Sequence, residues 1–255
     1  MDIHKPKPWH GLREFLKEYV IIVVGVATAL SAEAGVEWLH WRHAIADSRA
    51  ELAADARNII RVAAEREAQS PCLARQFAEI QGILDRAAVT GRLEPVAAVN
   101  GPTRRAWTIR SFEPAASGQV LPHMPVQERG LMTGANLWSL YIQKNRDEEV
   151  RAWAELRTLE GPGRKVSDVE LANLRSALTM AILQAQVIRG GSRHFAGRLV
   201  ATGLNSPATV AKTWREGLES KFRDSCGGDT DDIGESLRDL QRPRNDPPPA
   251  EDWQS

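Results

Sequence analysis

Three side chains that can bind a metal ion or carry a proton, Glu33, Glu37 and His40, follow one another at spacings of four and three residues. On an α-helix this spacing places them on one face. Carboxylate and imidazole groups bind transition metals, and the same groups relay protons in membrane proteins. A fourth ligand would have to come from elsewhere, and the sequence does not identify one. A polar stripe facing the membrane surface or a partner is the alternative, and we predict no metal or other cofactor.

The chain has two cysteines, Cys72 and Cys226, which lie near the two ends of the predicted helical domain. A disulfide between them would tie these ends together and stabilise the domain by up to about 5 kcal/mol in the chain-entropy model. Such a bond suits an oxidising compartment. Two ordinary thiols are the alternative.

Two segments come close to known functional motifs and fail at required positions. Gly190-Gly-Ser-Arg-His194 differs from the G-x-S-x-G nucleophile elbow, because His194 replaces the last glycine and no strand precedes it. Residues 229–234 imitate the start of a calcium loop, but Ile233 and Leu240 stand where calcium needs oxygen ligands. Neither segment predicts a site.

An enzyme site could instead be assembled by the connection at 92–124. The candidate residues are His123, Glu128 and His194, which would have to lie within hydrogen-bond reach of a substrate to act as acids or bases. No motif supports them, so catalysis is the alternative hypothesis and not the leading one.

A hydrophobic run from Tyr19 to Ala32 dominates the start of an otherwise highly charged chain. Extended to Trp38, the run has 20 residues with an aromatic ring at each end, the length and the interfacial residues expected of a transmembrane helix. Glu33 and Glu37 lie in its last third, where a carboxylate can reach the headgroup layer at low cost. We therefore predict a single-pass anchor at 19–38.

A cleaved signal peptide and a buried helix of a soluble protein are the alternatives to an anchor. Basic residues precede the run and Ala32-Glu33-Ala34 follows it, as in a signal peptide that is cleaved near Ala34. Against cleavage, the helical pattern continues past Ala34, because apolar residues from Ile45 to Ala63 recur on one helix face. The sequence leaves both alternatives open.

The residues of this run and the helix after it resemble a family of uncharacterised bacterial single-pass membrane proteins. Those proteins begin with a short hydrophobic helix of the form E-x-x-x-I-V-V-G-V-x-x-A-L, followed by a Trp-containing amphipathic helix. The matching residues are Glu18, Ile22, Val23, Val24, Gly25, Val26, Ala29, Leu30, Trp38 and Trp41. The resemblance implies a membrane anchor with a helical domain and implies no activity.

Capping residues, prolines and glycines divide the rest of the chain into predicted helices. Ser70-Pro71 predicts a helix start that leads to Thr90, and a capping box at Ser167 starts a helix that leads to Gly190. Further helices are predicted at 125–159, near 195–203 and at 206–224, with an ordered non-helical connection at 92–124. The predicted core of the helix at 125–159 comprises Leu131, Leu137, Leu140, Tyr141, Val150, Trp153, Leu156 and Leu159.

These elements predict an all-α protein in four parts. Residues 1–18 form a short N-terminal segment, 19–38 the transmembrane anchor, 39–226 an irregular helical bundle, and 227–255 a disordered acidic and proline-rich tail. The anchor helix is expected to continue into the bundle.

The net charge and the expected membrane topology restrict the classes of function. The net charge is zero with 33 residues of each sign, which argues against nucleic acid as a partner. The short leading segment and the cysteine pair favour an N-terminus inside and a periplasmic domain at the bacterial inner membrane. The leading hypothesis is a membrane-tethered interaction or scaffold module of the bacterial envelope, whose partners are the lipid bilayer and another protein or a second copy. A secreted binding protein is a further alternative if the chain is cleaved.

Overall fold

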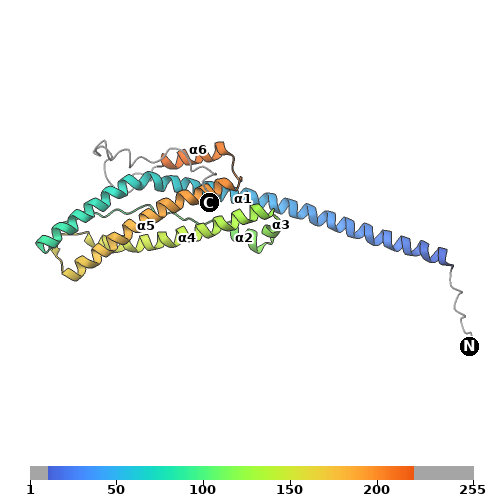
Figure 1. Ribbon diagram of the computed structural model, residues 1–255, viewed down its shortest axis with the longest axis horizontal. Coiled ribbons are helices and arrows are strands. Elements are labelled where there is room, and N and C mark those ends of the chain that lie inside the picture. Colours follow the sequence, from blue (N-terminus) through green and yellow to red (C-terminus); the bar gives the residue numbers. More distant parts are fainter. Residues whose placement is uncertain (1–10, 221–255) are drawn as a thin grey trace, which may run out of the picture. The chain divides into compact units, whose positions relative to one another are not determined.

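The computed structural model describes residues 11–220 and confirms the all-α class. Its longer helices are α1 (Leu12–Thr90), α4 (Val126–Leu156), α5 (Asp168–Ala201) and α6 (Pro207–Leu218). The shorter elements are β1 (Arg92–Leu93), α2 (Phe112–Ser117), α3 (Val120–His123), the 3-10 turn η1 (Arg157–Leu159) and β2 (Arg164–Lys165). Figure 1 shows them in chain order by colour. The predicted tail at 227–255 lies outside the described residues.

Contacts divide the chain into two units, residues 1–47 and 48–255. In the first unit, α1 carries its apolar side chains on the outside, with Val24 57% and Leu30 59% exposed. An 18-residue window of α1 has a mean hydropathy of 1.9 and no buried residue. By length and composition, α1 is the one helix among residues 11–220 that could cross a membrane.

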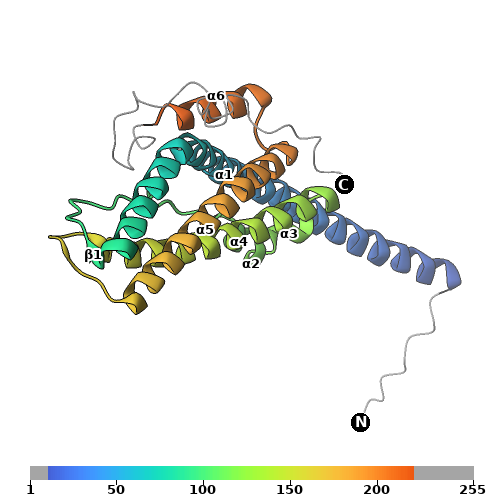
Figure 2. The ribbon, with the colours of Figure 1, turned by 60° about the vertical axis from the view of Figure 1, so that its left-hand side comes forward.

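The second unit, which begins at Ser48, is a helical bundle. The part of α1 after Ser48, α4 and α5 lie side by side (Figures 1 and 2), and ion pairs of Arg49 with Glu128 and of Arg66 with Glu149 join α1 directly to α4. Contacts between Gln184 and Glu148 and between His194 and Trp138 show that α4 and α5 run antiparallel. The last helix, α6, packs on α1.

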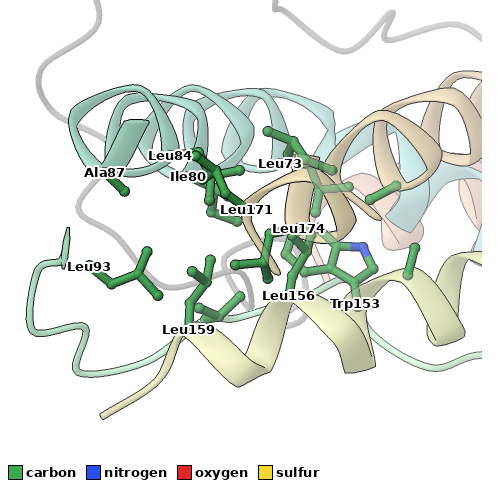
Figure 3. Close-up of a cluster of buried hydrophobic side chains, with 14 of the residues drawn as sticks. Leu73, Ile80, Leu84, Ala87, Leu93, Trp153, Leu156, Leu159, Leu171 and Leu174 are labelled. Atoms are coloured by element: carbon green, nitrogen blue, oxygen red, sulfur yellow. The ribbon is translucent and has the colours of Figure 1, made fainter. Parts of the chain in front are cut away.

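One end of the bundle has a continuous apolar core to which α1, α4, α5 and β1 contribute. Leu84, Leu156 and Leu174 are fully buried there, and Trp153 stacks on Phe77 with ring centroids 5.4 Å apart. Figure 3 shows these side chains converging from three helices. The antiparallel pair of β1 and β2 adds Leu93 and closes this end. Burial of large aliphatic side chains stabilises the fold by about 1.5–3 kcal/mol each.

Two predicted helix starts are confirmed by their caps. The Ser167 hydroxyl accepts a hydrogen bond from the Glu170 amide at 3.2 Å, and the Ser206 hydroxyl accepts one from the Thr209 amide at 3.2 Å. Each bond satisfies an amide of the first helical turn, which has no partner within the helix. Pro207 then occupies the first turn of α6, where its missing N–H costs nothing.

The helix start predicted at Ser70-Pro71 is wrong, because α1 continues through Pro71 to Thr90. A proline inside a helix loses one backbone hydrogen bond. Here the Ser70 hydroxyl donates to the Arg66 carbonyl at 3.1 Å, and Cys72 and Leu73 directly after the proline are buried. Burial on both sides of Pro71 therefore outweighs the local preference for a break.

The end predicted at Gly190-Gly191 is also wrong, because α5 runs on to Ala201 and absorbs the short helix predicted near 195–203. A Cβ atom on Gly191 would overlap Cδ1 of the buried Ile142 on α4. Gly190, by contrast, has nothing within 4 Å of the position of a Cβ atom. Gly191 therefore permits a close approach of two helices and does not end one.

The connection at 92–124 has more structure than predicted. It contains β1 and two short helices, α2 and α3, separated at Gln119, whose φ of 59° is left-handed. Trp107, Ile109 and Leu121 of this segment are buried. The connection is thus part of the packed domain, in line with its predicted order.

The predicted core of α4 was partly wrong. Trp153, Leu156 and Leu159 are buried as expected, but Leu137, Leu140 and Tyr141 are 62%, 55% and 47% exposed. Smaller residues on the neighbouring face, such as Ala135 and Ser139, are buried in their place. We call Leu137, Leu140 and Tyr141 the α4 outer surface.

We predict opposite effects of alanine at two helical glycines. In Gly217→Ala, the new Cβ would overlap the Arg61 carbonyl oxygen and lie 2.6 Å from Ala64 Cβ, which would push α6 away from α1. Such overpacking should lower the free energy of unfolding by about 1–3 kcal/mol. In Gly190→Ala, where space is open, the lower backbone entropy of the unfolded chain should raise it by about 0.5–1 kcal/mol.

Thermal unfolding of the full chain in non-ionic detergent, followed by circular dichroism, measures both changes. An unchanged or higher melting temperature for Gly217→Ala would contradict the close packing of α6 on α1, and a lower one for Gly190→Ala would contradict the open space at Gly190.

Candidate functional site: a buried arginine and glutamate network

Three consecutive charged residues of α1, Glu65, Arg66 and Glu67, are buried inside the bundle at 1%, 6% and 2% exposure. Successive side chains on a helix are separated by about 100°. Three in a row can be covered only if protein surrounds α1 on several sides. Each of the three therefore has its partner on a different segment.

Glu65 and Glu67 are each held by a bidentate arginine. Glu65 accepts hydrogen bonds from Nε and Nη2 of Arg105 at 2.9 and 3.3 Å, which ties α1 to the segment before α2. Glu67 accepts from Nε and Nη2 of Arg189 at 3.2 and 2.7 Å, which ties α1 to α5. Two parallel N–H to O bonds give these pairs a defined geometry.

Arg66 pairs with Glu149 of α4, and both side chains are almost fully buried. Burial raises the pKa of Glu149 above its ordinary value, and the positive charges of Arg66 and Arg146 only partly oppose this effect. The pair is therefore costly to desolvate. It would be more costly still to leave either member without the other.

Arginines outnumber carboxylates in this network. Glu65 lies near Arg61 and Arg105, Glu149 near Arg66, and Glu67 near Arg189 and Arg193. Five arginines thus contact three glutamates among the described residues.

A polar cavity of about 20 Å³ lies inside the network, lined by Glu65, Arg66, Arg105, Arg146 and Glu149 among others. Its volume suits about one water molecule. Nε of Arg146 is buried and has no hydrogen-bond partner within residues 11–220. The cavity is too small for a substrate, so the network is not an active site of ordinary size.

The residues predicted as a low-ranking metal site remain separate on the helix surface. Glu33, Glu37 and His40 are all exposed on the first unit's part of α1. Glu37 accepts a hydrogen bond of 3.4 Å from the Trp41 indole, and the His40 ring lies edge-on to the same indole. Within residues 11–220, no group of three His, Cys, Asp or Glu side chains is arranged to hold a metal ion.

The alternative catalytic residues take part in separate contacts. Glu128 forms a bidentate pair with Arg49 at 2.7 and 2.5 Å, and the open cavity beside it is lined by neither His123 nor His194. His194 packs against Trp138 and accepts a hydrogen bond from Nε of Arg198 at 2.9 Å. Burial and the charge of Arg198 lower the pKa of His194.

The cysteine pair and the two near-motifs do not form a site within residues 11–220. Cys72 is buried on α1, but Cys226 lies outside the described residues, so the disulfide stays a prediction. The segment at 229–234 lies outside them as well. The segment from Gly190 to His194 is an ordinary stretch of α5, with no strand before it and no elbow.

Sequence reasoning missed the buried network, although one signal was present. The apolar stripe of α1 passes through Ile59 and Ala63, and its next positions fall on Arg66 and Glu67. Charged residues at positions that continue an apolar stripe indicate either the end of burial or a buried ion pair. The return of apolar residues at Leu73 favours the buried pair.

Comparison with models of protein families, with curated proteins and with solved structures found no match to this chain.

We predict that the pair of Arg66 and Glu149 stabilises the fold only as a pair. Arg66→Met leaves Glu149 buried without its partner and should lower the free energy of unfolding by about 3–5 kcal/mol. The double variant Arg66→Met with Glu149→Leu removes both charges and should recover most of this loss. Chemical denaturation of the full chain in detergent measures the double-mutant cycle. Equal losses in the single and double variants would contradict the buried pair.

Proposed function

We propose that this chain is a single-pass protein of the bacterial inner membrane that holds a helical interaction or scaffold module at the membrane. The observation that carries the proposal is the apolar part of α1. The large apolar side chains from Tyr19 to Leu30 are about half exposed, and no part of the 18-residue apolar window is buried. An apolar surface of this extent is not stable in water and needs a bilayer or a partner to cover it.

Residues at both ends of this stretch suit the two membrane interfaces. Tyr19 and Phe15 stack at one end, and Trp38 lies at the other with Arg42 over its ring at 5.2 Å. Aromatic and basic side chains of this kind anchor transmembrane helices at the headgroup layer. The family resemblance of this segment points the same way. We propose that the N-terminus is inside and the bundle is periplasmic.

The bundle supports an interaction role better than a catalytic one. The acidic side chains Glu65, Glu67 and Glu149 in its interior are paired with arginines, and His194 is held by Trp138 and Arg198. The α4 outer surface, in contrast, presents large apolar side chains to solvent. Exposed aromatic and aliphatic residues on one helix face are typical of protein contact surfaces. A protein partner or a second copy of the chain would cover them.

We predict that the double variant Val23→Lys with Val24→Lys releases the protein from membranes. Each lysine near the centre of a transmembrane helix costs about 2.5–3.5 kcal/mol. The wild-type protein should stay in the membrane pellet after extraction at alkaline pH, and the variant should move to the soluble fraction. Val89→Lys is the matched control, because Val89 is 88% exposed on the bundle part of α1. Release of the wild-type protein by alkali would contradict the anchor.

The same membranes test orientation and processing. Protein alkylated without a reducing agent should have its full-length mass and carry no alkyl group, as expected for a disulfide in a periplasmic domain. Alkylation of both thiols would reverse the orientation. Loss of the first thirty or so residues would replace the anchor by a cleaved signal peptide.

We predict that the α4 outer surface contacts another protein in native membranes. Leu140→p-benzoylphenylalanine, a photo-crosslinking side chain on this surface, should form an adduct of defined mass on irradiation. The same side chain in place of Val89, which is at least as exposed, should form none. An adduct of twice the chain mass would identify a second copy as the partner. No adduct at Leu140 would contradict this contact surface.

A further inference from the structure

A groove of about 310 Å³ lies between α1 and α5 in the bundle. Its volume is at the lower end of the range of small-molecule sites. The apolar side chains along it are Leu73, Ala74, Phe77, Ile182 and Ala185. Phe77 also stacks on the buried Trp153, which holds its ring in place.

Both arginines of the groove lie at the same end. Arg66 is the first lining residue on α1, and Arg189 is the last on α5. Arg189 bonds to Glu67, the residue after Arg66, and both arginines line the groove. The other end of the groove, at Phe77 and Ile182, is apolar. The groove therefore has one cationic end and one apolar end.

These arginines keep hydrogen-bonding capacity. Arg189 uses Nε and Nη2 for Glu67, and Arg66 uses Nη2 for Glu149. The Nη1 group of each makes no hydrogen bond within residues 11–220, although each guanidinium has five N–H donors. Positively charged donors of this kind form stronger hydrogen bonds with an anionic acceptor than with a neutral one.

We propose that this groove binds a single-chain amphipathic anion, such as a medium-chain carboxylate. The apolar chain lies along Leu73, Phe77 and Ile182, and the anionic head accepts hydrogen bonds from Arg66 and Arg189. A cation is disfavoured by the arginines, and a neutral hydrocarbon would leave their remaining donors unused. This site does not depend on the proposed anchor or on the α4 outer surface.

Octanoate is the probe that tests the site. The full chain, reconstituted in phosphatidylcholine nanodiscs, is titrated with octanoate by calorimetry, and the heat from empty nanodiscs is subtracted. Saturable binding with one site per chain is expected. Octanol and octylamine, which have the same chain with a neutral or a cationic head, should bind at least tenfold more weakly.

Two variants of the groove, each with a matched control variant, locate the site. Gln186→Glu adds a carboxylate to the groove lining without touching the buried ion pairs, and should weaken octanoate binding at least tenfold. Asn173→Asp adds the same charge to an exposed position of α5 outside the groove, and should leave binding unchanged. Ala74→Trp fills the groove and should abolish binding, whereas Ala78→Trp, at an exposed position outside the lining, should not.

Three results would overturn the proposal. The first is the absence of saturable octanoate binding to the wild-type chain. The second is equal binding of octanol and octanoate, which would remove the role of the arginines. The third is unchanged binding in Gln186→Glu, whose exposed position keeps the fold intact and so makes this variant decisive even if Ala74→Trp does not fold.

Discussion

Enclosing three charged residues in a row, Glu65, Arg66 and Glu67, is the constraint that the rest of the bundle has to satisfy. An ionised group inside a protein is stable only with an opposite charge and hydrogen bonds in good geometry. Because the three side chains leave α1 in different directions, their partners must arrive from α4, α5 and the segment before α2 at one height along α1. Apolar packing tolerates small shifts of one helix along another, whereas bidentate pairs do not. The network therefore fixes the register in which these segments meet.

The same requirement explains why α1 does not stop at Pro71. The apolar core around Leu84 and Leu156 lies beyond the proline, and the ion pairs lie before it. A break at Pro71 would change the direction of the helix axis between the ion pairs and the apolar core. Keeping α1 continuous costs one backbone hydrogen bond at the proline, about 3 kcal/mol for an interior helical position. The combined burial on the two sides exceeds that cost, so a tertiary effect overrides a local signal.

Prediction from the sequence succeeded where the deciding physics is local. The caps at Ser167 and Ser206 and the apolar run of α1 depend on residues within a few positions of one another, and the structure has them as expected. Prediction failed where distant residues decide. From the sequence, Gly191 is interpreted as a helix end, because the sequence does not show that Ile142 lies against it. Leu140 is interpreted as a core residue, because the sequence does not show that Ala135 and Ser139 are the residues of α4 that face the core. The pairing of Arg66 with Glu149, 83 residues apart, has no local signal beyond a charge on an apolar stripe.

The arginines that hold Glu65 and Glu67 lie nearer the surface than these carboxylates. Arg189 has 39% of its side chain exposed, whereas the side chain of Glu67 is 2% exposed. Water therefore solvates the Arg189 guanidinium at the rim of the bundle. That rim is also the cationic end of the groove between α1 and α5. An anion bound there would reduce the repulsion among the arginines, and its apolar chain would cover Phe77 and Ile182. Because such a ligand binds only the folded bundle, its binding would raise the free energy of unfolding.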